Sequence, residues 1–139
     1  MRAITLTTET TCPRPTVYAY LADLASMAEW TEVVRTCDLV QGTPGERGAT
    51  YKQVLDLGGS EWDGTIEVTR TDPDRKLVTV ARTGPIKLTT TFELDDVAAG
   101  TSVRMILDPG VAGAPMASMF RSAGEVDLET LRRRLDVAR

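Results

Sequence analysis

Three polar side chains that could take part in acid–base or anion-binding chemistry fall where apolar faces are expected: Tyr51, Arg82 and Asp127. Asp127 lies at helical spacing from Met116 and Phe120, so a carboxylate interrupts an apolar stripe. A buried carboxylate must be paired, hydrogen-bonded or neutral. It would then serve as a polar handle or as a general acid with a raised pKa. The alternatives are a structural ion pair with an arginine of the sheet, or a helix rotation that exposes the group.

Arg82 is a candidate clamp for a carboxylate or phenolate. It shares a strand face with Val78 and Val80, and it points inward if that face is the inner one. The opposite face suits the interior nearly as well, and it carries Leu77, Thr79 and Ala81. Both orientations therefore stay open.

Two further polar residues, Tyr51 and Gln53, fall on the same strand face as Leu55 and Leu57, so all four are expected to face the core. A buried hydroxyl and a buried amide each need a partner, so they would either orient a ligand or satisfy one another. On another strand Trp62 shares the face of Ile66, where its ring would stack on a ligand or fill the core. Arg70 continues that face and is a second candidate cation.

Several kinds of chemistry are excluded by composition. The chain has no histidine, which removes Ser-His-Asp and Cys-His activation and histidine-ligated metals. Two cysteines, Cys12 and Cys37, cannot form an ordinary zinc site alone. The glycines between 42 and 48 are too loosely spaced, and lack a following helix, for phosphate binding. We expect no metal and no cofactor.

The charge balance argues against nucleic acid as a partner. The net charge is -4 and the pI is near 4.9, whereas proteins that bind nucleic acid need clustered positive charge to contact the phosphates. The one basic run, Arg132-Arg133-Arg134, lies near a predicted helix end, where cations favour the helix dipole. No secretory signal and no membrane-spanning run are visible. We therefore expect a cytoplasmic protein, with one domain over residues 1–139.

The pattern along the chain predicts strands first and a long helix last. Alternation around Ile4 predicts a short strand, and the prolines at 13 and 15 begin a broken pair of short helices that reaches Trp30. Strands follow at 33–40, 50–57, 61–71, 76–83, 86–94 and 103–107, separated by glycine, proline and aspartate turns. Because the connections are short, the strands must form an antiparallel meander.

From about Ala114 the pattern is helical, with one broad apolar face formed by Met116, Met119, Phe120, Ala123, Leu131 and Leu135. An amphipathic sheet and a long amphipathic helix must bury their apolar faces together. Small residues lie on both sides of this contact. They permit either close packing or a cavity that a ligand fills, and they are Ala117, Ala123, Gly124, Gly64 and Thr90.

In this order the elements resemble the START-like helix-grip superfamily, also called the polyketide cyclase/dehydrase and lipid transport group. The similarity covers nearly the whole chain. It is carried by the run Arg14–Asp23, by Trp30, by Gly45-Glu46-Arg47-Gly48, by Asp72-Pro73, by Gly100–Val103 and by Leu128–Arg132.

The resemblance implies an α+β helix-grip fold, in which a curved antiparallel sheet of about seven strands wraps a long C-terminal helix, with two short helices after the first strand. It also implies a ligand pocket between helix and sheet, but no particular chemistry. Together with the patterns above, it predicts that the pocket is lined by Trp30, Tyr51, Gln53, Trp62, Ile66, Arg82, Leu88, Thr90, Phe92, Met105, Met116, Met119, Phe120, Ala123 and Asp127.

Two functions of different classes follow. The favoured one is a binding module for a small apolar or aromatic molecule that is lipid-like or polyketide-like. The alternative is a polyketide cyclase or dehydratase that works by positioning, with Tyr51, Arg82 and Asp127 moving protons or stabilising an anion. A homodimer whose pocket is vestigial is a third option.

Overall fold

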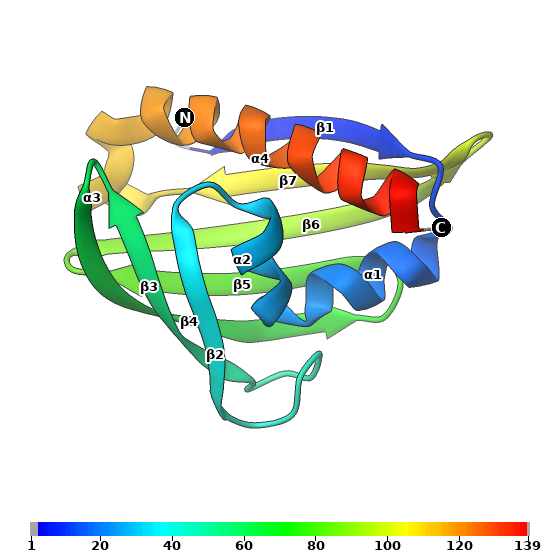
Figure 1. Cartoon of the computed structure of the whole chain (residues 1–139). Helices are drawn as coiled ribbons and strands as arrows, with labels where there is room; N and C mark the ends of the chain where they lie inside the picture. Colours follow the sequence, from blue (N-terminus) through cyan, green and yellow to red (C-terminus); the bar gives the residue numbers. More distant parts are fainter. Residues whose placement is uncertain (1–2, 139) are drawn as a thin grey trace.

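The chain forms one curved antiparallel sheet with helices on its concave side (Figure 1). The computed structural model describes residues 3–138 and confirms the predicted helix-grip fold. The elements are β1 (Ile4–Thr10), α1 (Arg14–Ala22), the 3₁₀ turn η1 (Leu24–Ser26), α2 (Met27–Trp30), β2 (Val34–Gln41), β3 (Thr50–Leu57), β4 (Ser60–Asp72), β5 (Lys76–Thr83), β6 (Ile86–Val97), β7 (Gly100–Asp108), α3 (Gly110–Gly113), the 3₁₀ turn η2 (Ala114–Met116) and α4 (Ala117–Ala138).

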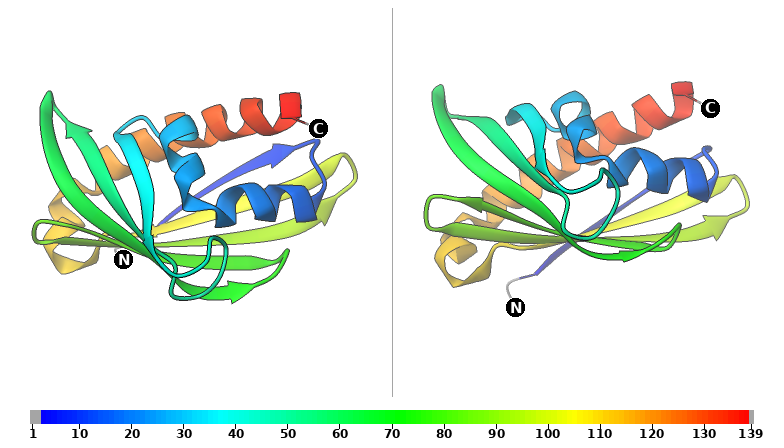
Figure 2. Two further views of the ribbon diagram at one scale, coloured as in Figure 1. Left: turned by 60° about the horizontal axis from the view of Figure 1, so that its bottom comes forward. Right: turned by 90° about the horizontal axis from the view of Figure 1, so that it is seen from below.

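The seven strands are ordered β1-β7-β6-β5-β4-β3-β2, and each is antiparallel to its neighbours. Tight turns explain the meander from β3 to β7. Gly58 and Gly59 between β3 and β4 have φ of 65° and 89°, which glycine adopts without a steric penalty. The first two strands of the chain lie at opposite edges. The segment α1–η1–α2 therefore crosses the concave face to connect them (Figure 2).

The long helix α4 packs closely on the β1 and β7 side of the sheet. A Cβ atom at Gly124 would lie 2.6 Å from Leu6 Cδ1 and 3.2 Å from Leu107 Cδ1 and from Met105 Cε, so a larger residue here would have to displace the ends of these side chains. Further along α4, Leu128, Leu131 and Leu135 are buried on the same side of the helix.

The apolar face of α4 is rotated from the predicted one at its N-terminal end. Met116 and Met119 are 36% and 49% exposed, so the expectation that both belong to a buried face was wrong. Met116 belongs to the 3₁₀ turn that contains Pro115, and α4 begins only at Ala117. Met119 is five residues before Gly124, which places it about 140° around the helix from the buried stripe.

Candidate functional site

Asp127 on α4 is hydrogen-bonded to the backbone rather than paired with an arginine. Its Oδ1 accepts the N–H of Glu32 at 2.9 Å, which ties α4 to the junction between α2 and β2. Burial raises the pKa of the Asp127 carboxyl to about 6, and the negative charge of Glu32 adds to the effect while the hydrogen bond opposes it. The side chain is neither fully exposed nor part of an ion pair, so neither sequence-based alternative applies.

Arg82 points away from the interior. It pairs across the sheet with Thr65, and both are exposed, whereas Leu77 and Thr79 on the other face of β5 are buried. Of the two orientations left open, the outward one is therefore correct. The prediction that Arg82 lines the pocket was therefore wrong.

A β-bulge reverses the expected direction of Arg70. The register of β4 against β5 shifts between Val68 and Arg70, so Val68 faces Thr79 inside while Arg70 pairs with Val78 outside. Arg70 is exposed. Strict alternation, which predicted Arg70 on the inner face, fails where a bulge inserts an extra residue.

Tyr51 and Gln53 both face the interior of the sheet, and neither satisfies the other. The Tyr51 hydroxyl donates to Asp23 Oδ1 at 3.2 Å, and burial, together with Asp23, raises its pKa to about 12. Gln53 is 1% exposed, and within residues 3–138 its Nε2 makes two long contacts, to Cys37 Sγ at 3.6 Å and to Met27 Sδ at 3.7 Å. Sulfur is a weak acceptor, so Gln53 is poorly satisfied.

Trp30 is buried at the end of α2, where it packs edge-on against Phe92 of β6. The two ring centroids are 6.1 Å apart with an angle of 73° between the planes. The indole Nε1–H of Trp30 is buried and has no hydrogen-bond partner in the described part of the chain. Trp30 therefore serves as a packing residue that also leaves a donor unused.

Partly exposed apolar side chains meet at the end of the sheet beside the start of α4. Leu55 and Trp62 pair across β3 and β4, and the Trp62 ring lies 3.7 Å from where a Cβ of Gly84 would be. A Cβ at Gly113 would lie 3.5 Å from Phe120 Cε2 and 3.6 Å from Ile86 Cγ2.

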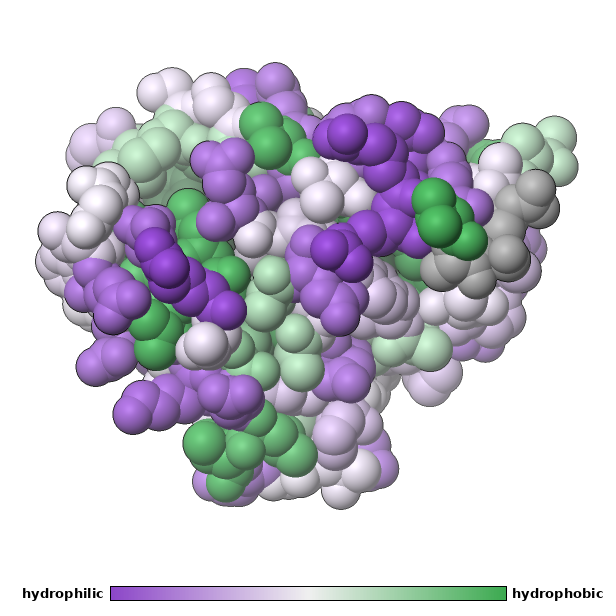
Figure 3. All heavy atoms as spheres, in the orientation of Figure 1, coloured by the Kyte–Doolittle hydropathy of each residue, from purple (hydrophilic) through white to green (hydrophobic). Residues whose placement is uncertain are grey.

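We call the four side chains Leu55, Trp62, Ile86 and Phe120 the apolar rim. Trp62 is 47% exposed, which a plain core role does not explain. In Figure 3 the surface is hollowed between the start of α4 and the β3–β4 hairpin, and apolar atoms lie in the hollow.

The remaining residues predicted to line a pocket divide by burial. Those of the central strands are buried, namely Ile66, Phe92 and Met105. Those nearer the rim are half-buried, namely Leu88, Thr90 and Ala123. The strand register places the five strand residues on the concave side of the sheet, and Ala123 lies on α4.

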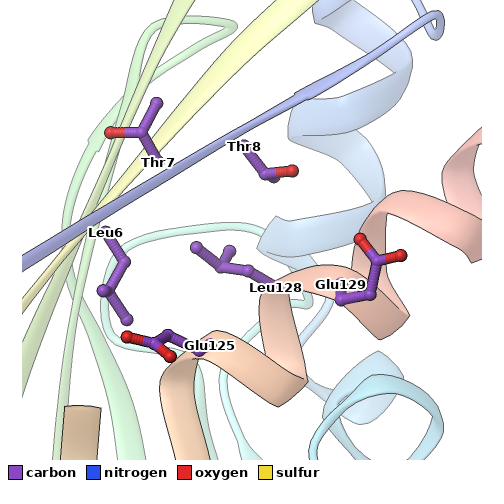
Figure 4. A pocket seen from close by; sticks show the side chains of 6 residues that line it. All are labelled: Leu6, Thr7, Thr8, Glu125, Leu128 and Glu129. Atoms are coloured by element: carbon purple, nitrogen blue, oxygen red, sulfur yellow. The ribbon is translucent and has the colours of Figure 1, made fainter. Parts of the chain in front are cut away.

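Two hollows lie on the outer surface, and no residue predicted to bind a ligand lines either of them. The first, of about 180 Å³, lies at the seam between β1 and α4 (Figure 4). Its lining combines Leu6 and Leu128 with two threonines and two glutamates. The second, of about 230 Å³, lies beside the turn from β7 into α3 and includes Lys87 and Asp108. Neither is lined by residues of the central strands on the concave face, where the predicted ligand-binding residues lie.

Charge is distributed unevenly between the inside and the outside. Among residues 3–138, no lysine or arginine is buried. The same residues contain no cluster of side chains suited to a metal ion, and no helix with the length and hydropathy needed to cross a bilayer. The interior therefore offers hydrogen bonds and apolar surface, but no cation.

The sequence matches the family described as "Polyketide cyclase / dehydrase and lipid transport" over residues 1–136. The chain belongs to this family, as the resemblance predicted. No curated protein is similar enough to count as a match.

Solved structures with the same fold are numerous and distant in sequence. Protein CV1439 from Chromobacterium violaceum has a TM-score of 0.78 at 17% identity, with 97% of each chain covered. DynU16, from the dynemicin biosynthetic locus, has a TM-score of 0.72 at 15% identity, and the match covers all of this chain and 49% of that one. Ara h 8.0201 has a TM-score of 0.70 at 11% identity, with 96% of each chain covered. These likenesses establish the fold alone.

Sequence reasoning missed three residues that shape this region: Asp23, Met27 and Ile86. Asp23 caps η1 through Ala25 and also accepts the Tyr51 hydroxyl. An aspartate just before a short helical turn is a capping signal, so this role was visible in principle. The contact of Met27 with Gln53 joins two segments that are distant in sequence, and no local sequence pattern predicts it.

Proposed function

We propose that this protein binds a small apolar or aromatic molecule between its sheet and α4, and that the ligand enters past the apolar rim. The observation that carries the proposal is the rim itself. A tryptophan that is 47% exposed, next to half-buried aliphatic and aromatic side chains, covers an interior that contains poorly satisfied polar groups. Exposed apolar surface of this kind marks binding sites.

Family membership supports the same proposal. The family description names lipid transport beside cyclase and dehydrase activity. A carrier needs apolar walls and access, and it needs no activated nucleophile. This chain has no histidine to activate one, and Arg82 is turned outward.

Native mass spectrometry of the purified protein tests the proposal, together with titration by Nile red, an uncharged dye that fluoresces in apolar surroundings. We expect a bound compound or saturable dye binding. Ala123 lies three residues from Phe120 and four from Asp127, on the side of α4 that faces this space. Ala123→Trp should therefore fill the space and weaken dye binding at least about tenfold.

Ser122→Trp is the matched control, because Ser122 is exposed on the same helix. It should leave dye binding unchanged. A wild-type protein that binds neither dye nor any copurifying compound contradicts the proposal, as does equal dye binding by Ala123→Trp and wild type.

A cyclase or dehydratase is the second candidate, and Asp127 is the observation that favours it. Its carboxyl has a pKa near 6, so it both holds and releases a proton near neutral pH. The other two candidate catalytic residues are less suited to proton transfer. Arg82 faces solvent, and the Tyr51 hydroxyl is engaged by Asp23.

Product distribution from a poly-β-ketone intermediate tests this second candidate. If Asp127 acts on the substrate, Asp127→Asn should change the proportions of cyclised products, whereas Arg82→Ala should not. An unchanged distribution with Asp127→Asn argues against catalysis and leaves the binding function in place.

A further inference from the structure

The indole N–H of Trp30 has no acceptor, and this narrows the chemistry of a ligand that could bind beside it. A buried N–H without an acceptor costs about 1–3 kcal/mol relative to one that is satisfied. The Trp30 Nε1 atom is buried and unpartnered within residues 3–138, although its ring packs against Phe92 on the concave face of the sheet. An acceptor that arrives with a ligand would remove this penalty.

The Gln53 amide lies beside the same short helix. Its Nε2 is 3.7 Å from Met27 Sδ, and Met27 is three residues before Trp30 on α2, so both residues are on one side of the helix. The other contact of Nε2, with Cys37 Sγ at 3.6 Å, is also to sulfur. Gln53 is thus a second N–H donor in this part of the interior whose partners are weak.

Among residues 3–138, the interior offers no cation to a negative charge. No lysine or arginine among residues 3–138 is buried, and the chain has no histidine. Two carboxylates hydrogen-bond to this region: the half-buried Asp127, on Glu32 N, and the exposed Asp23, on the Tyr51 hydroxyl. A carboxylate brought into this space would lose its water without gaining a counter-ion, and it would meet two acids.

We infer that the ligand is an uncharged molecule with an apolar or aromatic body and a carbonyl oxygen, which accepts a hydrogen bond from Trp30 Nε1–H, and that the Gln53 amide is a second donor beside α2. This inference rests on the proposed function and narrows its ligand class. Ketones, esters and quinones belong to the class. Free fatty acids and other carboxylates do not.

A third buried polar atom, the Tyr18 hydroxyl on α1, also lacks a partner among the described residues. The charges of Asp72 and Asp74, at the turn between β4 and β5, act on it. This turn lies beside Leu77, which pairs with Phe92, so Tyr18 is a further buried donor on the Trp30 side of the sheet.

Three probes of nearly equal size separate the possibilities: 2-ethylnaphthalene, 2-acetylnaphthalene and 2-naphthoate, each competing with Nile red at pH 8. We expect the ketone to bind roughly threefold to tenfold more tightly than the hydrocarbon, as one or two hydrogen bonds would give. We expect the carboxylate to bind at least about tenfold more weakly than the ketone.

Nuclear magnetic resonance of the native protein identifies the donor without relying on a variant that fails to fold. The indole N–H signal of Trp30, assigned by its persistence in Trp62→Phe, should move downfield with the ketone and not with the hydrocarbon. Gln53→Met and Trp30→Phe should each lower the ratio of ketone affinity to hydrocarbon affinity, and this ratio is the readout whatever happens to hydrocarbon affinity itself.

The outcomes separate the inference from the function on which it rests. If the hydrocarbon displaces Nile red but the ketone gains nothing, or if 2-naphthoate binds as tightly as the ketone, the inference fails and the binding function stands. If neither Nile red nor any of the three probes binds, the binding function fails and the inference fails with it.

Discussion

At the scale of single residues, two aspartates of α4 differ in how the fold shifts their acidity. Asp127 is desolvated, which raises the pKa of its carboxyl to about 6. Asp136 accepts the Thr10 hydroxyl at 2.6 Å and the Thr11 N–H at 3.0 Å, and these bonds lower its pKa. A raised folded-state pKa makes protonation favour the fold, and a lowered one makes ionisation favour it.

Asp127→Asn should stabilise the protein at pH 7.5. The folded pKa exceeds the unfolded value near 3.9, so the wild type becomes more stable as the pH falls from about 7 to about 4. Asparagine keeps an oxygen for the Glu32 N–H and carries no charge. We expect a gain of about 1 kcal/mol at pH 7.5, after allowance for solvent screening, and none near pH 4.

Denaturant unfolding of both proteins at pH 7.5 and pH 4 measures the effect. Asp127→Ala is the control, because it removes the hydrogen bond to Glu32 together with the charge. A loss of stability in Asp127→Asn at pH 7.5 would show that the carboxylate is needed in its ionised form.

Asp136→Asn should have the opposite effect. The folded pKa is lowered, so the contribution of Asp136 is present above the unfolded pKa near 3.9 and is lost as the pH falls through the folded value. We expect the variant to lose only about 1 kcal/mol at pH 7, because Asp136 is partly solvated. The difference from wild type should vanish near pH 2. Thermal unfolding across this pH range checks the sign, and a difference independent of pH would contradict it.

At this scale, sequence patterns identify unusual residues more reliably than they predict which way the side chains point. Asp127 stands out because it interrupts an apolar stripe. Whether Arg82 faces inward depends on which side of β5 the helix covers, and both sides carry apolar residues. The unused Trp30 donor could not be predicted, since it depends on packing between α2 and β6.

At the scale of elements, turns were the most predictable feature and strand faces the least. Gly58-Gly59 falls between β3 and β4, and β4 ends at Asp72 just before Pro73, as expected, because glycine, proline and aspartate favour turn geometry directly. The bulge that turns Arg70 outward has no local signal. The delayed start of α4 does have one, since Pro115 lacks the N–H that a continuous helix would need.

Gly100→Ala should be the most damaging glycine substitution in the turns. Gly100 has φ of 155°, and a Cβ there would overlap the Thr10 carbonyl oxygen and lie 2.7 Å from the Thr11 carbonyl carbon. Both neighbours are backbone and cannot move away cheaply. We expect a loss of about 2–4 kcal/mol.

Gly59→Ala provides the matched comparison. Gly59 has φ of 89° but no atom within 4 Å of a Cβ, so only backbone strain applies and the cost should be about 1 kcal/mol. Urea unfolding of both variants gives the two values. Equal losses would mean that the overlap with Thr10 and Thr11 relaxes without penalty.

At the scale of the whole molecule, contacts distant in sequence join the two ends of the chain. β1 pairs with β7 along its full length, and the Thr10 and Thr11 bonds to Asp136 tie the end of β1 to the last turns of α4. Asp127 ties the middle of α4 to the entry of β2. These links predict that the chain unfolds as one cooperative unit.

Thiol labelling tests this cooperativity. Cys12 follows β1 and Cys37 lies in β2 at the other edge of the sheet, and both are buried. In Cys12→Ala and Cys37→Ala, the remaining thiol should react with an aromatic disulfide reagent only upon global unfolding. The free energy of opening should therefore equal the free energy of unfolding that circular dichroism gives for the same variant. A smaller value for Cys37 would show that β2 opens on its own.

The placement of β1 also has a consequence for biosynthesis. Strands β2 to β7 pair with neighbours in sequence and can form hairpins as the chain leaves the ribosome, but β1 is made first and its partner β7 ends at Asp108. The first strand must therefore wait, unpaired, while about three-quarters of the chain is synthesised. Its alternating threonines limit exposed apolar surface during that interval, and chaperone contact or premature association should depend most on Ile4 and Leu6.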